Sequence, residues 1–164
     1  MDPNTRDTIA AIATPIGLAG IGIVRISGPR AEEIARRIFS PGTPGKSFQT
    51  HHLHLGNLVD PATGSQIDEV LLSIMKSPHS YTREDVVEIN SHSGYLLLSR
   101  ILRIVLSEGA RLAVPGEFTF RAFMNGRIDL TQAEAIVDLI NAQSQRGLEL
   151  ATRQIKGTLR GLIQ

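Results

Sequence analysis

The chain has 164 residues, of which 41% are hydrophobic and 20% charged, a composition typical of a folded globular protein that excludes a disordered or fibrous chain. Its net charge of +1 is too small to attract a polyanion by itself, and the absence of cysteine excludes disulfides and thiolate metal sites. No apolar run approaches the roughly 18 residues of a membrane span, and the first residues lack the pattern of a signal peptide. We therefore expect a cytoplasmic protein with no membrane contact.

Short strands with interspersed helices are predicted for most of the chain. The strand candidates are short runs rich in isoleucine, valine and leucine, bounded by glycine and proline turns. The helix candidates repeat apolar residues at helical spacing, and the second one stops at Gly109, a glycine C-cap. In chain order we expect strands at 7–14 and 20–27, a helix at 28–40 that ends before Pro41, strands at 51–60, 67–76 and 84–92, a helix at 94–109, a short strand at 110–114 and a short helix at 116–126.

The last segment predicts one long amphipathic helix. From Leu130 to Leu162, apolar or small residues recur at steps of three and four, over about 34 residues or roughly 50 Å of helix. Thr131 and Glu134 fit a capping box at its start, and Asp129 adds negative charge near the positive end of the helix dipole. Nothing in the chain remains to cover the far half of such a helix, so we expect the chain to be cut short or to pack there on another chain.

Residues 13–28 contain four glycines, and they also contain one arginine that lies within a predicted strand. The glycines follow G-x-x-G-x-G and precede a strand, whereas a phosphate-binding loop has a different order and opens a helix. We interpret them as a tight turn that also permits close backbone approach. Arg25, which stands between Val24 and Ile26, must reach solvent on an edge strand or find an anionic partner, and both readings stay open.

Two further motifs are interpreted as unrelated to phosphate or metal binding. Residues 41–47 end like a P-loop, but Ser40 stands where the first glycine should be. His52 and His54 would share one strand face, yet no third ligand is evident, so we interpret them as solvated histidines. We therefore expect no metal site.

Glu88 is a carboxylate that we expect to be paired with a hydrogen-bond donor or a cation. In a strand, Val86 and Glu88 share one face while Val87 and Ile89 share the other, so Glu88 is held within an apolar run. A buried carboxylate must be paired, either with a structural arginine or with a ligand edge that carries two adjacent N–H donors. His92 follows in the turn and could line the same cavity.

A group of polar residues precedes the predicted long helix. A solvated helix end explains any one of them, but together they predict a polar pocket rim. The group consists of Glu117, Arg121, Asn125 and Arg127.

Three segments, 13–28, 80–94 and 115–140, closely resemble in order and spacing the N-terminal region of the MnmE (TrmE) family of tRNA-modification GTPases, and the resemblance runs from Asp7 to the end of the chain. It implies an α+β fold, a mixed sheet with packed helices like the folate-binding domain of glycine-cleavage T-protein and dimethylglycine oxidase. Residues 1–124 would be the folate-binding and dimerisation domain. Residues 125–164 would begin an all-α domain with its first long helix, while the GTPase domain and the C-terminal part are absent from this chain.

The resemblance also implies a site for 5-formyl- or 5,10-methylene-tetrahydrofolate. Arg25 matches the arginine of the family's R-I-S-G motif, Glu88 the second glutamate of E-D-x-x-E, and Arg127 the basic residue before D-L-x-Q-A-E-A. Glu88 would pair with the amino and ring N–H edge of the pterin, and the two arginines with its carbonyl or carboxylate oxygens. Further candidates for the pocket lining are His92, Arg121 and Asn125.

The sequence departs from the family pattern at two of these places. Ser93 replaces the first of two glycines after the histidine, and Arg127 replaces the usual lysine, whose point charge differs from a guanidinium fork.

For the whole protein, the resemblance implies a homodimeric GTPase. Together with the flavoprotein MnmG (GidA) it would add a carboxymethylaminomethyl or aminomethyl group to C5 of the wobble uridine of certain tRNAs. GTP, Mg²⁺ and K⁺ would bind in the GTPase domain, because this chain has no G-x-x-x-x-G-K-[ST] motif and no catalytic residue of its own. Two alternatives stay open, an assembly module whose pocket is vestigial and a stand-alone folate-dependent aminomethyltransferase.

Overall fold

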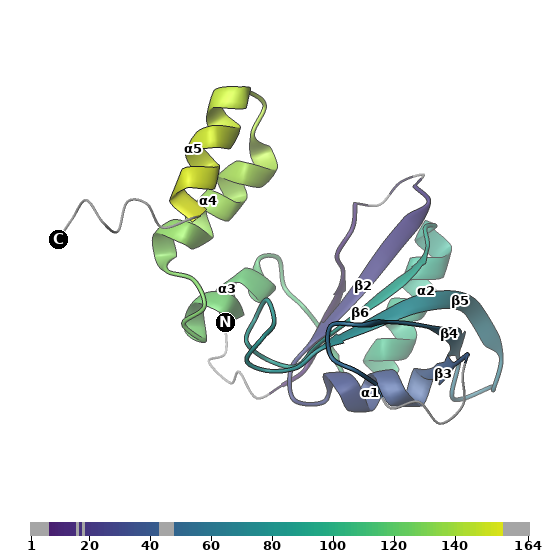
Figure 1. The fold of residues 1–164 in the computed structure, drawn as a ribbon. Coiled ribbons are helices and arrows are strands. Elements are labelled where there is room, and N and C mark those ends of the chain that lie inside the picture. Colours follow the sequence, from purple (N-terminus) through teal and green to yellow (C-terminus); the bar gives the residue numbers. More distant parts are fainter. Residues whose placement is uncertain (1–6, 16, 18, 43–47, 156–164) are drawn as a thin grey trace. The chain divides into compact units, whose positions relative to one another are not determined.

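The computed structural model describes residues 7–15, 17, 19–42 and 48–155, which form two compact units that divide between Pro115 and Gly116. The first unit holds a β-sheet with two helices, and the second holds three helices (Figure 1). Our predicted domains, 1–124 and 125–164, place the short helix near residue 120 with the sheet, whereas the compact units place it with the later helices. Compact units are not by themselves domains, so the predicted domain boundary at residues 124 and 125 stays a prediction.

The sheet has seven strands in the order β3-β4-β5-β6-β2-β1-β7. All neighbours are antiparallel except β1 and β7, which are parallel, so the predicted α+β fold with a mixed sheet is confirmed. The strands are β1 (Ile9–Ile12), β2 (Ile21–Ser27), β3 (Phe39–Pro41), β4 (Leu53–Val59), β5 (Gln66–Met75), β6 (Val86–His92) and β7 (Arg111–Leu112).

Helices α1 (Ala31–Ile38) and α2 (Tyr95–Ser107) pack on one face of this sheet and form the core with it. Strand residues alternate between the two faces, and the core-facing ones include Val24, Ile26, Val87 and Ile89, each fully buried. Gly109 ends α2 as predicted. Its backbone has a φ of 107°, and its N–H donates to the carbonyl oxygen of Leu106, the geometry of a glycine C-cap.

The edge strand β3 was not predicted from the sequence. We expected a helix to residue 40, but α1 ends at Ile38 and the next three residues pair with β4. Pro41 is tolerated there because an edge strand leaves one row of backbone groups unpaired. Residues 43–47 lie outside the described residues, so the interpretation of segment 41–47 stays a prediction.

The second unit contains α3 (Glu117–Met124), α4 (Leu130–Asn141) and α5 (Gln145–Ile155). The single long helix predicted from Leu130 is therefore wrong. The backbone of Ala142 is extended, which ends α4. The Ser144 hydroxyl accepts the backbone N–H of Gly147 and so caps the start of α5. The two helices fold back on each other, with Ala135 and Ala151 buried. The expectation that the far half lacks a partner falls away, because α5 packs on α4.

The cap of α4 also differs from the prediction. Asp129 is the N-cap, and its carboxylate accepts the backbone N–H of Gln132 at 2.8 Å. The amide oxygen of Gln132 accepts the backbone N–H of Asp129 in return, at 3.0 Å. The capping box is thus formed by Asp129 and Gln132 and not by the expected Thr131 and Glu134. An aspartate is as good an N-cap residue as a threonine, so the helix can begin at Leu130.

None of the helices in the described residues is long and apolar enough to cross a membrane.

Candidate functional site

The face of the sheet opposite α1 and α2 carries the candidate site, and we call it the second face. Antiparallel register places Arg25 of β2 directly beside Glu88 of β6, and Glu88 beside Ser73 of β5. The next row along the strands contains Ile23, Asn90 and Leu71 in the same order. The second face therefore has a polar row in its middle strands, and on the adjacent row Asn90 stands between two apolar side chains.

Arg25 and Glu88 form an ion pair. The guanidinium donates from Nε to Glu88 Oε1 at 2.8 Å, and its Nη2 lies 2.7 Å from the same oxygen. The side chains are 27% and 22% exposed. Of the two readings of Arg25, exposure on an edge strand is wrong, because β2 lies between β6 and β1. Each residue is the charged partner that the other was expected to need.

The geometry of this pair leaves one carboxylate oxygen open. Nε and Nη2 of Arg25 both contact Oε1, and none of the described residues donates a hydrogen bond to Oε2 of Glu88. An ionised carboxylate has about four acceptor positions over its two oxygens. Glu88 can therefore accept donors from a ligand while it keeps its bond to Arg25.

His92 lies on the second face at the far end of β6, about 13 Å along the strand from Glu88 at ordinary strand spacing. Its partner is Asp68, whose carboxylate accepts the backbone N–H of His92 at 2.9 Å and contacts its Nδ1 at 2.9 Å. The side chain of His92 is 74% exposed. The role of His92 in a shared cavity with Glu88 stays a prediction, and its pairing with Asp68 was missed from the sequence.

Tyr81 is a further residue that the sequence reasoning missed. Its ring lies over the Arg25 guanidinium, with 5.5 Å from Cζ to the ring centroid. Two residues after Arg25 in β2, the Ser27 hydroxyl bonds the hydroxyl of Thr82 at 2.6 Å and donates to Glu84 at 2.7 Å. The segment that carries Tyr81 is therefore bonded to the strand that carries Arg25.

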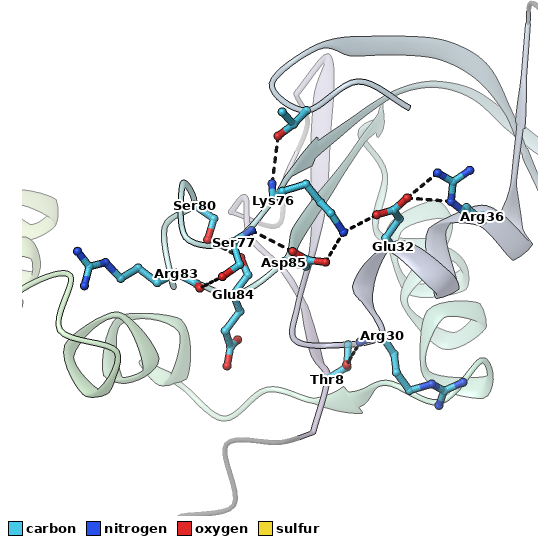
Figure 2. Close-up of polar contacts among 11 residues, drawn as sticks. Thr8, Arg30, Glu32, Arg36, Lys76, Ser77, Ser80, Arg83, Glu84 and Asp85 are labelled. Atoms are coloured by element: carbon cyan, nitrogen blue, oxygen red, sulfur yellow. Dashed lines mark hydrogen bonds and ion pairs between the residues drawn. The ribbon is translucent and has the colours of Figure 1, made fainter. Parts of the chain in front are cut away.

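Lys76 ties the start of this segment to α1 (Figure 2). Its ammonium group donates to Glu32 at 2.6 Å and also to Asp85, and Asp85 accepts the backbone N–H of Ser77 at 2.9 Å. The hydrogen bonds to Asp85 and Glu32 raise the pKa of Lys76 above its ordinary value. The hydrogen bond from Lys76 lowers the pKa of Glu32, which also accepts from Arg36.

The second unit carries the other three predicted site residues on α3 and just after it. Arg121 is 2% exposed and pairs at 3.2 Å with Glu117, one turn earlier in α3. Asn125 is the C-cap residue, and the N–H of the exposed Arg127 donates to the carbonyl oxygen of Ala122. These bonds complete a helix-ending turn, and the role of the three residues in ligand binding stays a prediction.

The histidine pair does not share a strand face. His52 lies before β4 and contacts the carbonyl oxygen of Thr50, whereas His54 lies within β4 and contacts that of Gln49. In the part of the chain that the structure describes, no three His, Asp or Glu side chains are grouped to hold a metal ion.

The family model described as "GTP-binding protein TrmE N-terminus" matches residues 8–127, which include Arg25, Glu88 and Arg127. The chain belongs to this TrmE N-terminal family. The match covers the whole sheet together with α1, α2 and α3.

Full-length relatives extend well beyond this region. The "tRNA modification GTPase MnmE" of Syntrophobacter fumaroxidans is 59% identical over 156 residues, which are 95% of this chain and 33% of the relative. The proteins of the same name from Geobacillus thermodenitrificans and Carboxydothermus hydrogenoformans are each 54% identical over 160 residues, which are 96% of this chain and 35% of each relative. The chain thus spans about a third of the length of these curated relatives.

Proposed function

We propose that this chain is the folate-binding part of a tRNA-modification GTPase and that a tetrahydrofolate one-carbon donor binds at Arg25 and Glu88. The observation that carries the proposal is the open Oε2 of a carboxylate whose other oxygen is held by an arginine. A pterin presents an amino group and a ring N–H side by side, and either of these groups can donate a hydrogen bond to such an oxygen.

The two charged groups have complementary tasks in this proposal. Glu88 accepts the N–H edge of the pterin, and Arg25 keeps the carboxylate ionised and in place. Arg25 is also proposed to serve a carbonyl oxygen of the ligand, because a planar guanidinium can bond more than one acceptor at a time. Arg127, which belongs to the second unit, is proposed by itself as a residue that binds carboxylate oxygens of a ligand.

For the whole protein, we propose the activity that the names of the relatives state, which is tRNA modification by a GTPase. GTP, Mg²⁺ and K⁺ would bind in a part of the protein beyond this chain, and MnmG and tRNA would be its partners in the cytoplasm. The chain itself supplies no residue to GTP hydrolysis in this proposal.

The test is a calorimetric titration of the 164-residue chain with 5-formyltetrahydrofolate. Glu88→Gln keeps the shape of the side chain and removes its charge, and hydrogen bonds to charged groups contribute about 1.5–3 kcal/mol, so we expect affinity to fall roughly 10- to 100-fold. Glu69→Gln is the matched control, because Glu69 is an exposed residue of β5 that does not contact Arg25. Absence of binding to the unchanged chain, or equal binding to the Glu88 variant, would contradict the proposal.

A second candidate function is assembly without ligand binding. The observation that favours it is a group of exposed leucines on the second face, Leu53, Leu55 and Leu71, with exposed fractions of 64%, 57% and 39%. Exposed apolar patches of this kind mark protein interfaces, and we propose a homodimer. Sedimentation of the titrated samples separates the two functions, since an assembly module forms a stable dimer whose mass is the same with and without folate and shows no heat of binding.

A further inference from the structure

We propose that Tyr81 is a positioning residue of this site, and that its ring holds the Arg25 guanidinium on one oxygen of Glu88 so that the other oxygen stays open to a ligand. The inference rests on the proposed function of the Arg25 and Glu88 pair. It adds a residue that acts on the ligand through Arg25.

The observed pairing is one of two that an arginine and a carboxylate can form. In the commoner fork-to-fork arrangement, two N–H groups of the guanidinium bond both carboxylate oxygens. Here Nε and Nη2 of Arg25 both lie on Oε1 of Glu88, at 2.8 and 2.7 Å. A fork-to-fork pair would take one of the two acceptor positions of Oε2 and would compete there with the N–H edge of a ligand.

The Tyr81 ring is placed to select between these arrangements. The Arg25 guanidinium lies 5.5 Å from the ring centroid, within the roughly 6 Å over which an aromatic face attracts a cation. Rotation of the planar guanidinium onto both oxygens would change its position under the ring. The ring therefore favours the orientation in which only Oε1 is used.

The ring can do this because its loop is fixed on both sides of residue 81. Thr82 is fully buried, and its hydroxyl donates to the Ser27 hydroxyl, since the single Ser27 proton is given to Glu84. Ser27 and Arg25 project from the same face of β2, so one strand anchors both the loop and the guanidinium.

The first part of the loop is anchored separately. Ser77 donates from its backbone to Asp85 and from its hydroxyl to the carbonyl oxygen of Arg83, and Lys76 joins Asp85 to Glu32 of α1 (Figure 2). These bonds close the loop on itself and on the helix. Tyr81 is thus held by the framework of the first unit.

The experiment compares Tyr81→Leu with Tyr81→Phe in the titration with 5-formyltetrahydrofolate. Removal of the ring should weaken binding roughly three- to tenfold, the range that a cation–π contact supports, while the phenylalanine variant keeps the ring and should bind within about twofold of the unchanged chain. Tyr95→Leu is the matched control, because Tyr95 is the other tyrosine of the chain, lies on α2 and is 61% exposed.

A double-mutant cycle tests whether the ring acts through Arg25. Arg25→Lys keeps the charge but lacks the planar fork, so Tyr81→Leu added to it should weaken binding less than about twofold further. Urea unfolding of every variant confirms that each is folded under the titration conditions.

The outcomes separate this inference from the proposed function. If the unchanged chain binds no folate, both are overturned. If it binds and Glu88→Gln weakens binding while Tyr81→Leu does not, the folate site stands and the role of Tyr81 is overturned. If Tyr81→Leu and Arg25→Lys weaken binding additively, or if Tyr81→Phe is as weak as Tyr81→Leu, the ring does not act by positioning Arg25, and the inference is overturned.

Discussion

Gly22→Ala is expected to destabilise the sheet unit, because the space beside Gly22 is already filled. A Cβ atom built on Gly22 would lie 2.6 and 2.7 Å from the two Cδ atoms of Leu98, and 3.1 Å from its Cγ. Carbon atoms in ordinary contact are about 3.5–4.0 Å apart. Leu98 is 1% exposed and packs α2 on the sheet, so it cannot move away without disturbing the core.

The magnitude follows from two opposing effects. Overpacking of a core by extra methyl groups costs about 1–3 kcal/mol. Replacement of glycine by alanine restricts the unfolded chain, which stabilises the fold by about 0.4–1 kcal/mol where the backbone is compatible. We therefore expect Gly22→Ala to lower the free energy of unfolding by about 0.5–2 kcal/mol.

Urea unfolding followed by tyrosine fluorescence is the assay. The chain has no tryptophan, and both tyrosines, Tyr81 and Tyr95, lie in the first unit, so the signal reports on that unit. Gly20→Ala is the control, since a Cβ there would meet nothing within 4 Å, and it should not destabilise.

A second substitution tests the reason for the effect. Leu98→Ala alone should cost about 2–5 kcal/mol through the cavity it leaves. Combined with Gly22→Ala it should cost less than the sum of the two, because the new methyl group occupies part of that cavity. An unchanged stability of Gly22→Ala, or strict additivity of the pair, would refute the close-packing argument.

Two further substitutions test the loop anchor and the helix cap. Glu32→Gln should lower the free energy of unfolding at neutral pH by less than about 1 kcal/mol, since its pair with the half-exposed Lys76 is screened by solvent. The fold lowers the pKa of Glu32 below its ordinary 4.5, so the unchanged chain loses this stabilisation as the pH falls below about 4.5 and through the lowered pKa, and a urea series over pH should show a weaker acid dependence in the variant. Asp129→Ala removes the N-cap of α4 and should cost about 1 kcal/mol, measured as an earlier loss of helical circular dichroism in urea, whereas an unchanged transition would show that the cap is dispensable.

Local sequence patterns were sufficient for most elements of the first unit. Runs of β-branched residues predicted strands, and the stop at Gly109 predicted the end of α2, because each signal lies within the element it describes. The break between α4 and α5 was missed because no local signal marks it. Residues 142–144 contain neither glycine nor proline, and two helices that pack on each other keep the same spacing of apolar residues as one long helix.

The site was predicted as a set of residues, but its contacts were not. Arg25 and Glu88 are 63 positions apart in the sequence, and only the register between β2 and β6 places them side by side. The pattern showed that each needed a charged partner and could not show that they were partners of each other. Tyr81 carried no signal at all, because its position over Arg25 depends on the loop that Ser27 and Lys76 anchor.

The ion pair between Arg25 and Glu88 is compatible with a binding site, because a bound ligand would replace the water at Oε2 of Glu88. A ligand that covers the partly exposed pair would remove water from Oε2 of Glu88, and an acceptor buried without a donor costs about 1–3 kcal/mol. A ligand with an N–H edge replaces that water, whereas one with a carbonyl oxygen at the same place also brings two oxygens into repulsive contact. In the proposed function, the pair would therefore select for ligands with N–H donor edges. The apolar neighbours Ile23 and Leu71 would add attraction for a flat ring, and neither side chain offers a group that could bond a polar atom of the ligand.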